Sequence, residues 1–297
     1  MKIPVSSLDL VYNPVSGSFS QAHLDALVAA LRSQGFEVTP LPTTAEGAQF
    51  SGDADLICIH GGDGTLRDCV KTLGEDAGRI PLAVAPSGTI NLVARELGYP
   101  RQPEAFARKL AEGWKRGSES WIHAPLYQLG DMPIVSCLSI GPDSHAVARV
   151  SGPLKKRIGR YAYVVAMMQQ MREWPRSAMQ IRGTAVDGER FECAAEAVIV
   201  SSAALYAGPF RLSPQAALAA DSVELISLKK STRLRTIALS LAAMFNLPVA
   251  RLGIAEVRSV RRVEFDRCVT PVQVDGDHMP DCAWAIGPSG LTLRYVV

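Results

Sequence analysis

The stretch that decides the fold is Asp55-Leu-Ile-Cys-Ile-His60, followed at once by Gly61-Gly-Asp-Gly-Thr65. The first six residues form a short apolar run, which predicts a buried strand. Three glycines in the next four positions let the backbone turn tightly and approach a ligand without interference from Cβ atoms. A helical pattern then continues to about Gly74. A strand, a glycine turn and a helix in this order predict an α/β domain.

The same alternation runs through the first hundred residues. Further strand patterns lie at Leu8–Tyr12, Phe36–Pro40 and Pro81–Ala85, and further helix patterns at Gln21–Gly35 and Ile90–Leu97. Strands that alternate with helices predict a parallel sheet whose faces are both covered. We therefore expect an α/β domain over residues 1–122.

After about residue 122 the pattern changes to short strands, which predict an antiparallel β-sandwich domain over residues 123–297. The expected strands are Leu126–Tyr127, Ile134–Ser139, Met179–Arg182, Glu192–Ser201, Val223–Leu228, Arg262–Phe265, Val272–Val274 and Leu291–Val296. Two helical stretches interrupt them, Arg157–Trp174 and Arg233–Asn246.

Three turns of small residues follow strands of the first domain. They are Asn13-Pro-Val-Ser-Gly17, Gly61–Thr65 and Pro86-Ser-Gly-Thr89, where Thr89 is a candidate cap for the next helix. In parallel sheets, ligands bind at the carboxyl ends of strands. Backbone N–H groups in such turns, together with a helix N-terminus, suit phosphate oxygens. The three turns thus indicate one shared phosphate-bearing ligand.

Asp63 is the unexpected residue of the glycine turn, because a carboxylate repels phosphate. It fits there if a cation mediates, or if it orients a hydroxyl or a ribose. The chain has no G-x-x-x-x-G-K-[ST] motif, and no G-x-G-x-x-G follows a strand. These absences argue against a P-loop NTPase and a Rossmann dinucleotide site.

The motifs in chain order resemble the diacylglycerol kinase catalytic-domain family, which includes bacterial lipid kinases similar to sphingosine and ceramide kinases and is distantly related to NAD kinases. The matching stretches are N-P-x-S-G from Asn13, G-G-D-G-T-L from Gly61, P-x-G-T-x-N-x-x-A-R-x-L-G from Pro86, the basic segment Lys155–Tyr163, the Gly-rich hairpin Tyr206–Pro214 and Val274-Asp-Gly-Asp277. The resemblance implies an NAD kinase- or diacylglycerol kinase-like α/β domain that binds nucleotide and a β-rich domain that binds a lipid substrate.

The resemblance also implies ATP, Mg²⁺ and a set of site residues. The nucleotide-binding positions would be Asn13, Thr43, His60, Gly61, Gly62, Asp63, Gly64, Thr65, Leu66, Ser87, Gly88 and Thr89. Asp277 would accept the proton of the lipid hydroxyl. Asp275 and Asp277 would divide the roles of metal ligand and general base, because the two residues alternate around a glycine and would share one face of a strand. Asp63 is the third predicted catalytic residue. A structural Mg²⁺ would lie at Asp221, beside the backbone of Leu218 and Val223.

Several residues depart from the family pattern. Leu92 stands where an aspartate is frequent, Asp277 where glutamate is usual, and Ser222 and Glu224 where Gly and Asp usually follow Asp221. Two alternatives therefore stay open. One is an NAD kinase-like enzyme with a soluble acceptor, and the other is a catalytically weak protein that binds lipid or nucleotide.

Charge and cysteine usage bear on partners and location. The 31 basic and 29 acidic residues give a net charge of +2, which does not indicate a nucleic-acid partner. Residues 1–123 carry a net −3 and residues 124–297 a net +5, so the second domain suits an anionic membrane. No signal peptide or membrane-spanning run is recognised. Six cysteines without regular spacing indicate free thiols in a reducing compartment, so we expect a cytoplasmic protein that is peripheral on the inner membrane face.

Two basic stretches are candidates for membrane contact. Lys155, Lys156, Arg157 and Arg160 lead into a helical stretch with Met and aromatic residues up to Trp174. Lys229, Lys230, Arg233 and Arg235 precede the apolar run Ile237–Leu247. A basic end followed by apolar residues is typical of an interfacial helix. A helix packed on the sandwich with a solvated basic start fits each stretch as well.

Overall fold

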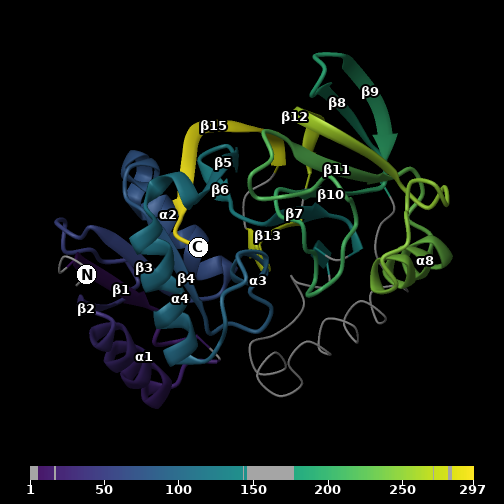
Figure 1. Ribbon diagram of the computed structural model, residues 1–297. Helices are drawn as coiled ribbons and strands as arrows, with labels where there is room; N and C mark the ends of the chain where they lie inside the picture. Colours follow the sequence, from purple (N-terminus) through teal and green to yellow (C-terminus); the bar gives the residue numbers. More distant parts are fainter. Residues whose placement is uncertain (1–5, 17, 143, 146–176, 270, 280–282) are drawn as a thin grey trace. The chain divides into compact units, whose positions relative to one another are not determined.

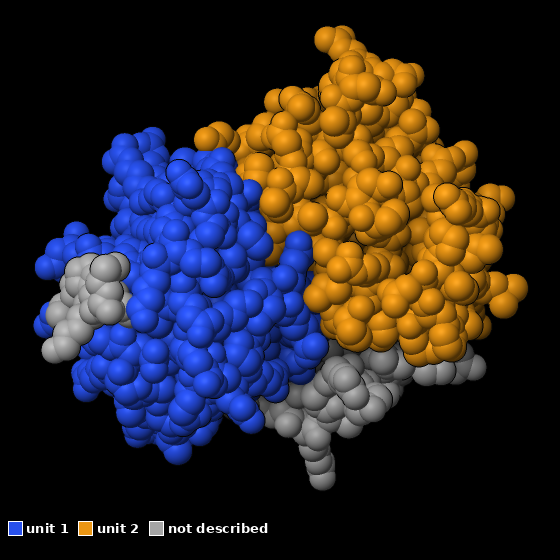
Figure 2. Space-filling view, viewed as in Figure 1, with its two compact units in different colours: residues 1–124, 291–297 blue, residues 125–290 orange. Residues whose placement is uncertain are grey.

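The computed structural model describes residues 6–16, 18–142, 144–145, 177–269, 271–279 and 283–297 (Figure 1). The chain divides into two compact units (Figure 2). Unit 1 consists of residues 1–124 and 291–297, and unit 2 of residues 125–290. The expected helix Arg157–Trp174 and the basic segment Lys155–Tyr163 lie outside the described residues.

The sheet of unit 1 is parallel, as the alternation of strands and helices predicts. Its strands are β1 (Ser6–Tyr12), β2 (Phe36–Pro42), β3 (Leu56–Gly61) and β4 (Leu82–Pro86), in the spatial order β4-β3-β1-β2. Every residue of β3 and β4 is buried, which is expected of parallel strands covered on both faces.

Helices connect these strands and pack against the sheet. They are α1 (Gln21–Ser33), α2 (Asp63–Leu73), α3 (Leu92–Glu96) and α4 (Pro103–Arg116), with short 3₁₀ turns at Gly74–Gly78 and Ser118–Ser120. The hydroxyl of Ser20 caps α1 by accepting a hydrogen bond from the His23 N–H at 3.4 Å. Helices α1 and α4 pack side by side.

The last residues of the chain return to unit 1. Tyr295, in β15 (Ala283–Tyr295), pairs in parallel with Leu82 of β4, and the Tyr99 hydroxyl donates a hydrogen bond to the Val296 carbonyl. Tyr295 and Val296 are fully buried there. Residues 291–297 were predicted to belong to the second domain, because the sequence of a strand does not indicate which sheet it joins.

Unit 2 is built on antiparallel strands, and this confirms the predicted fold class. The strands are β5 (Ile122–Leu129), which begins in unit 1, β6 (Met132–Ile134), β7 (Cys137–Ile140), β8 (Met179–Ala185), β9 (Arg190–Ala195), β10 (Ala197–Ser201), β11 (Val223–Leu228), β12 (Glu256–Val269), β13 (Val272–Val274), β14 (Asp277–Met279) and the first part of β15. The main order is β14-β13-β7-β10-β11-β12-β15, and β8 pairs with both β12 and β9.

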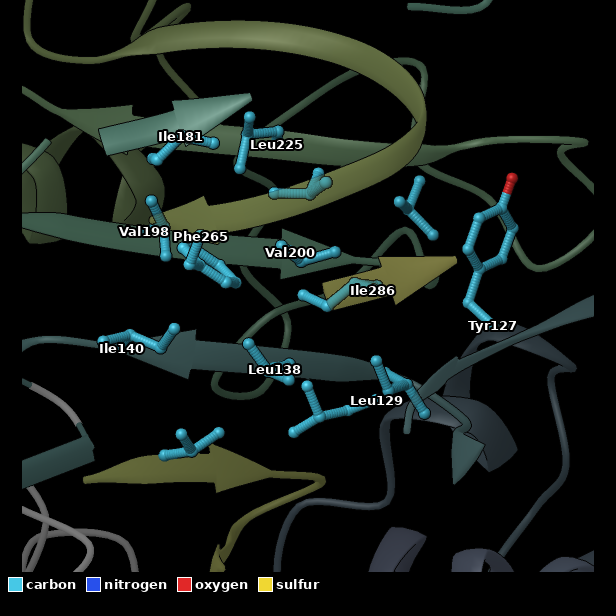
Figure 3. Packing of buried hydrophobic residues seen from close by; sticks show 14 of the residues in the cluster. Tyr127, Leu129, Leu138, Ile140, Ile181, Val198, Val200, Leu225, Phe265 and Ile286 are labelled. Carbon is cyan, nitrogen blue, oxygen red and sulfur yellow. The ribbon is translucent and has the colours of Figure 1, made fainter. Parts of the chain in front are cut away.

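Side chains alternate between two cores in unit 2. Val198 and Val200 of β10 point into a core shared with β7, β11 and β12, where Leu138, Ile140, Leu225 and Phe265 converge (Figure 3). Ile199, between them, belongs to a second core that packs under helix α8 (Arg233–Met244). Because both faces are buried, β10 contains no charged residue.

Gly113 of α4 packs so closely on the chain end that a Cβ atom would collide with the backbone of Val297. We expect Gly113→Ala to lower the free energy of unfolding by about 1–3 kcal/mol through overpacking, although alanine favours helices. Urea denaturation measures this change. The neighbouring, exposed Glu112→Ala is the control and is expected to stay within about 0.5 kcal/mol of wild type. A Gly113→Ala protein as stable as wild type would contradict the packing.

Candidate active site

The carboxyl ends of all four parallel strands lie in register at one edge of the unit 1 sheet. Tyr12 pairs with Pro42 on one side and with His60 on the other, and Gly61 pairs with Pro86. The Thr43 N–H donates to the Tyr12 carbonyl at 2.8 Å. The three turns predicted to share one edge therefore do so, and Thr43 joins them.

Two of these turns touch through their backbones. The Ser87 N–H donates to the Gly61 carbonyl at 3.2 Å. A Cβ atom at Gly88 would lie 2.8 Å from the Gly62 Cα and 2.6 Å from the Asn91 Oδ1, so a larger residue does not fit at this position unless its neighbours shift. Helix α2 begins at Asp63 with Gly62 as its N-cap, so Asp63, Gly64 and Thr65 form its first turn. This cradle joins an amide-rich turn to the N-terminus of an eleven-residue helix, a combination that suits phosphate.

Asp63 does not point its charge at this cradle. Its carboxylate accepts hydrogen bonds from the backbone N–H groups of Leu92 at 2.8 Å and Val93 at 3.0 Å, at the start of α3. Burial raises the pKa of the Asp63 carboxyl above its usual range, against the lowering effect of these two bonds. The Asp63 carboxylate therefore links the turn after β3 to the start of α3. This role explains an aspartate in the predicted phosphate-binding turn without a cation or a ribose.

Asn91 is a residue of this site that the sequence analysis did not select. It has left-handed backbone angles (φ 55°, ψ 61°), is buried and serves as the N-cap position of α3. The predicted cap, Thr89, is exposed and lies two residues before it. The Asn91 Nδ2 donates to the Gly88 carbonyl at 2.6 Å, whereas its Oδ1 has no hydrogen-bond partner among the described residues. Asparagine adopts left-handed backbone angles more readily than most residues, so the residue type at position 91 was the one signal in the sequence for this conformation.

His60 is the second buried group with unmet polar atoms. It is 1% exposed, and neither ring nitrogen has a hydrogen-bond partner within the part of the chain that the structure describes. Its ring stacks on that of His23, with 5.4 Å between centroids. Burial, and secondarily the charge of His23, lower the pKa of His60 to about 4. A neutral imidazole here can both donate and accept hydrogen bonds.

In unit 2, Asp275 lies in a network of backbone amides. Its carboxylate accepts from the N–H groups of Val135 (3.1 Å), Ser136 (2.8 Å) and Cys137 (3.1 Å), and from the Ser136 hydroxyl at 2.6 Å. These bonds explain why the predicted strand Ile134–Ser139 splits into β6 and β7: its central N–H groups bind a carboxylate instead of a neighbouring strand.

Asp275 and Asp277 do not share one face of a strand, and that expectation was wrong. Val274 pairs directly with Asp277, so Asp275 and Gly276 form a two-residue hairpin turn with φ values of 51° and 88°. Positive φ at both central residues is the property for which an Asp-Gly pair is favoured in hairpins. Asp275 is thus held inside the turn, and Asp277 starts β14 with a half-buried side chain.

The expected structural metal position carries an ion pair. The Asp221 carboxylate accepts from the Arg261 guanidinium at 2.9 Å, and the Asp221 side chain is 76% exposed. Glu224 is buried and binds the hydroxyls of Ser213, at 2.7 Å, and Ser259. No group of three or more His, Cys, Asp or Glu side chains suited to a metal occurs among the described residues. These contacts leave the metal role of Asp221, Leu218 and Val223 a prediction.

A parallel α/β unit with this strand-end cradle, joined to an antiparallel β unit, defines a two-domain protein of the NAD kinase and diacylglycerol kinase type. Residues 7–119 match the family described as the diacylglycerol kinase catalytic domain, and residues 136–293 match the YegS C-terminal NAD kinase beta sandwich-like domain. The chain therefore belongs to the diacylglycerol kinase catalytic-domain family, and this membership supports a kinase, that is, a phosphotransferase.

Curated relatives and solved structures agree with this assignment. The chain is 26% identical over 230 residues to a diacylglycerol kinase of Bacillus subtilis (strain 168), which covers 75% of this chain and 73% of that protein. It is 26% identical over 239 residues to a diacylglycerol kinase of Staphylococcus aureus (strain Newman), covering 75% and 70%. A crystal structure of a diacylglycerol kinase from Bacillus anthracis str. Sterne superposes with a TM-score of 0.67 at 19% identity, covering 99% of this chain and 98% of that one. At this identity the structural likeness establishes the fold.

The low pKa of His60 makes stability depend on pH. The native state keeps His60 neutral down to about pH 4, whereas the unfolded chain takes up a proton near pH 6.5. The contribution of His60 to the free energy of unfolding is therefore fully present above about pH 6.5. It falls as the pH drops towards 4, by roughly 1.4 kcal/mol per pH unit at most. His60→Leu should flatten this slope in urea denaturation between these values. The exposed His123→Gln is the control, and equal slopes for both variants and the wild type would contradict the assignment.

Asp275 is expected to matter for the fold of unit 2. Asp275→Asn replaces one acceptor oxygen by an NH₂ group that faces backbone donors, so we expect the free energy of unfolding to fall by roughly 2 kcal/mol. The matched control is Asp187→Asn, whose carboxylate accepts a backbone N–H from Glu189 at 2.9 Å in an exposed turn. Equal stability of the two variants by urea denaturation would show that the buried network contributes nothing.

Proposed function

We propose that this protein is an ATP-dependent lipid kinase that phosphorylates a hydroxyl of a membrane lipid, such as diacylglycerol, a sphingoid base or a ceramide. The observation that carries the proposal is the cradle of Gly61, Gly62 and Gly88 at the start of α2, from which the Asp63 charge is turned away. Such a cradle favours an anionic ligand, and family membership makes a nucleotide the natural one.

The residues of unit 1 offer the kinds of chemical group that bind a nucleotide. The backbone of Gly61–Thr65 would hold phosphate oxygens, with Ser87, Gly88 and Thr89 beside it. The unmet polar atoms of His60 and Asn91 would receive the polar groups of the nucleotide, and Asn13, Thr43 and Leu66 would border it. ATP supplies the phosphoryl group when it is bound, together with a divalent cation such as Mg²⁺ on its phosphates.

Asp277 would act on the acceptor. The lipid hydroxyl oxygen would form the new bond to the transferred phosphorus while the bond from that phosphorus to the departing ADP breaks. The hydroxyl would give its proton to the Asp277 carboxylate, which must lie within about 3 Å of it. Phosphoryl transfer needs positioning and charge stabilisation more than covalent help, so one well-placed carboxylate suffices. Asp275 would serve as a positioning residue, because its hydrogen bonds fix the turn that precedes Asp277. Asp63 would likewise act by positioning the two loops.

A lipid acceptor requires access to a membrane surface, so the proposal includes peripheral association with the inner face of the membrane from the cytoplasm. No helix within the described residues is both long and apolar enough to cross a bilayer. The net charge of +5 over residues 124–297 would favour an anionic surface.

A soluble acceptor is the second candidate, because the match of residues 136–293 is to an NAD kinase-like domain. A single panel separates the two: purified protein, labelled ATP and Mg²⁺ with diacylglycerol, sphingosine and ceramide in mixed micelles, and with NAD⁺ in solution. Transfer to a lipid supports the proposal. Transfer to NAD⁺ alone, or ATP binding without transfer to any acceptor, contradicts it.

Removal of the Asp277 carboxylate should slow the lipid reaction. We expect Asp277→Asn to lower kcat by roughly 10²–10⁴-fold, the range typical of a lost general base, with little change in ATP binding. Asp277→Glu, which restores the residue usual in the family, is expected to keep substantial activity. Glu189→Gln in the exposed β8–β9 turn is the control. Unchanged turnover in Asp277→Asn would remove Asp277 from the chemistry.

A further inference from the structure

Helix α8 of unit 2 presents large apolar side chains to the outside. Leu234 is 80% exposed, Phe245 64% and Leu241 47%, and Ile237 and Met244 are exposed to a similar degree. Leu247 and Leu252, in the segment after the helix, are exposed too. Isolated exposed hydrophobic residues are ordinary, but a contiguous apolar patch marks a site of interaction.

The four exposed large apolar residues of α8 and Phe245, the C-cap residue of the helix, form one stripe. Their spacing of three and four places Leu234, Ile237, Leu241, Met244 and Phe245 on one face of a helix. The opposite face packs on the core beneath, through Thr236, Leu239, Ala242 and Ala243. The packing of the helix on unit 2 is therefore already satisfied by its inner face, and the outer stripe does not contribute to it.

The chain reversal after α8 continues the apolar surface. Asn246 has a φ of 51°, and the N–H of Leu247 donates to the Ala242 carbonyl at 2.7 Å, which is the hydrogen bond of a Schellman cap. This cap ends the helix and fixes the direction of the following segment, which carries Leu247 and Leu252.

The chain segment that carries the stripe has charges of one sign only. Residues 229–255 contain five basic and no acidic residues, namely Lys229, Lys230, Arg233, Arg235 and Arg251, and all five are exposed. Lys229 also contacts Glu256, with 2.7 Å between Nζ and Oε1. An apolar stripe whose own chain segment carries only basic charges has the composition of a helix that lies in the interface of an anionic bilayer.

We propose that α8, with the segment up to Leu252, is the surface by which this protein docks on an anionic phospholipid bilayer. The apolar stripe would enter the headgroup region, and the basic residues would contact lipid phosphates. A helix of twelve residues is about 18 Å long, too short to span the hydrocarbon core and long enough to lie along its surface. The inference rests on the proposed function for its purpose, since a lipid kinase must reach a bilayer, but not for its evidence.

Vesicle flotation of the full chain tests this docking surface directly. The probe is phosphatidylcholine vesicles with and without phosphatidylglycerol. Wild type should bind the anionic vesicles. Leu241→Glu should bind roughly tenfold more weakly, because the leucine side chain that would be buried in the bilayer is lost. The double variant Arg233→Glu/Arg235→Glu should also bind more weakly, and its loss of binding should be largest at low salt. Val186→Glu is the matched control, because Val186 is a 42% exposed apolar residue in the β8–β9 turn, and it should bind as wild type does. Urea denaturation checks that each variant folds.

Three results would overturn the proposal: equal vesicle binding of Leu241→Glu and wild type, no binding by wild type, or a wild-type dimer that Leu241→Glu converts to monomer in sedimentation. The last result would assign the stripe to a second copy of the chain. Kinase assays keep this test separate from the proposed function. Vesicle binding that depends on α8 in a protein that phosphorylates no lipid would refute the kinase and leave the docking surface standing. Undiminished phosphorylation of vesicle lipid by Leu241→Glu would be a fourth result against the docking surface and would leave the kinase standing.

Discussion

The site in unit 1 depends on the hydrogen bonds that the Asp63 carboxylate accepts from the backbone of Leu92 and Val93. They tie the turn after β3 to the start of α3, and so hold Gly62 and Gly88 in contact. They also turn a negative charge away from the cradle, where it would repel a phosphate. The amide groups are consequently left to face a ligand, in a chain segment without a lysine or arginine between His60 and Leu66.

A carboxylate that accepts backbone N–H hydrogen bonds also holds a loop in unit 2. Asp275 binds three consecutive backbone N–H groups, as Asp63 binds two, and in both cases a short carboxylate replaces the missing partner strand or missing helical turn. Buried carboxylates are costly unless they are hydrogen-bonded, so each holds its loop in one arrangement. The carboxylates in two of the family motifs, Gly61–Leu66 and Val274–Asp277, therefore divide into those that hold the loops and one, Asp277, that is proposed to act on a substrate.

Much of the fold could be predicted from the sequence, because local patterns of apolar residues and turns determine where its strands and helices form. The apolar run before Gly61 and the regular alternation up to Leu97 specify parallel strands, and the short strands after residue 122 specify an antiparallel domain. The return of residues 291–297 to β4 could not be predicted in this way, since pairing between distant strands leaves no local signal. The division of Ile134–Ser139 into two strands was hidden for a similar reason, because its cause lies about 140 residues away at Asp275.

The candidate site was predictable in its location but less so in its detail. The turns at Gly61 and Pro86 follow strands, so their meeting at one sheet edge follows from parallel topology. The direction of the Asp63 side chain and the unmet oxygen of Asn91 depend on a contact between two loops, which residue types alone do not reveal. Asp275 and Asp277 look equivalent in the sequence, but the positive φ of Asp275 and its bonds to the backbone N–H groups of Val135–Cys137 separate their surroundings.

The return of the chain end to β4 has a consequence for biosynthesis. Unit 2 is inserted between two parts of unit 1, so residues 1–124 leave the ribosome long before the strand end that pairs with Leu82. Until then the hydroxyl of Tyr99 and the edge of β4 lack their native partners, and this edge is open to pairing with another chain. Unit 1 is thus the first of the two units to emerge and the last to be completed, because its final strand pairing must wait until the inserted unit has been synthesised.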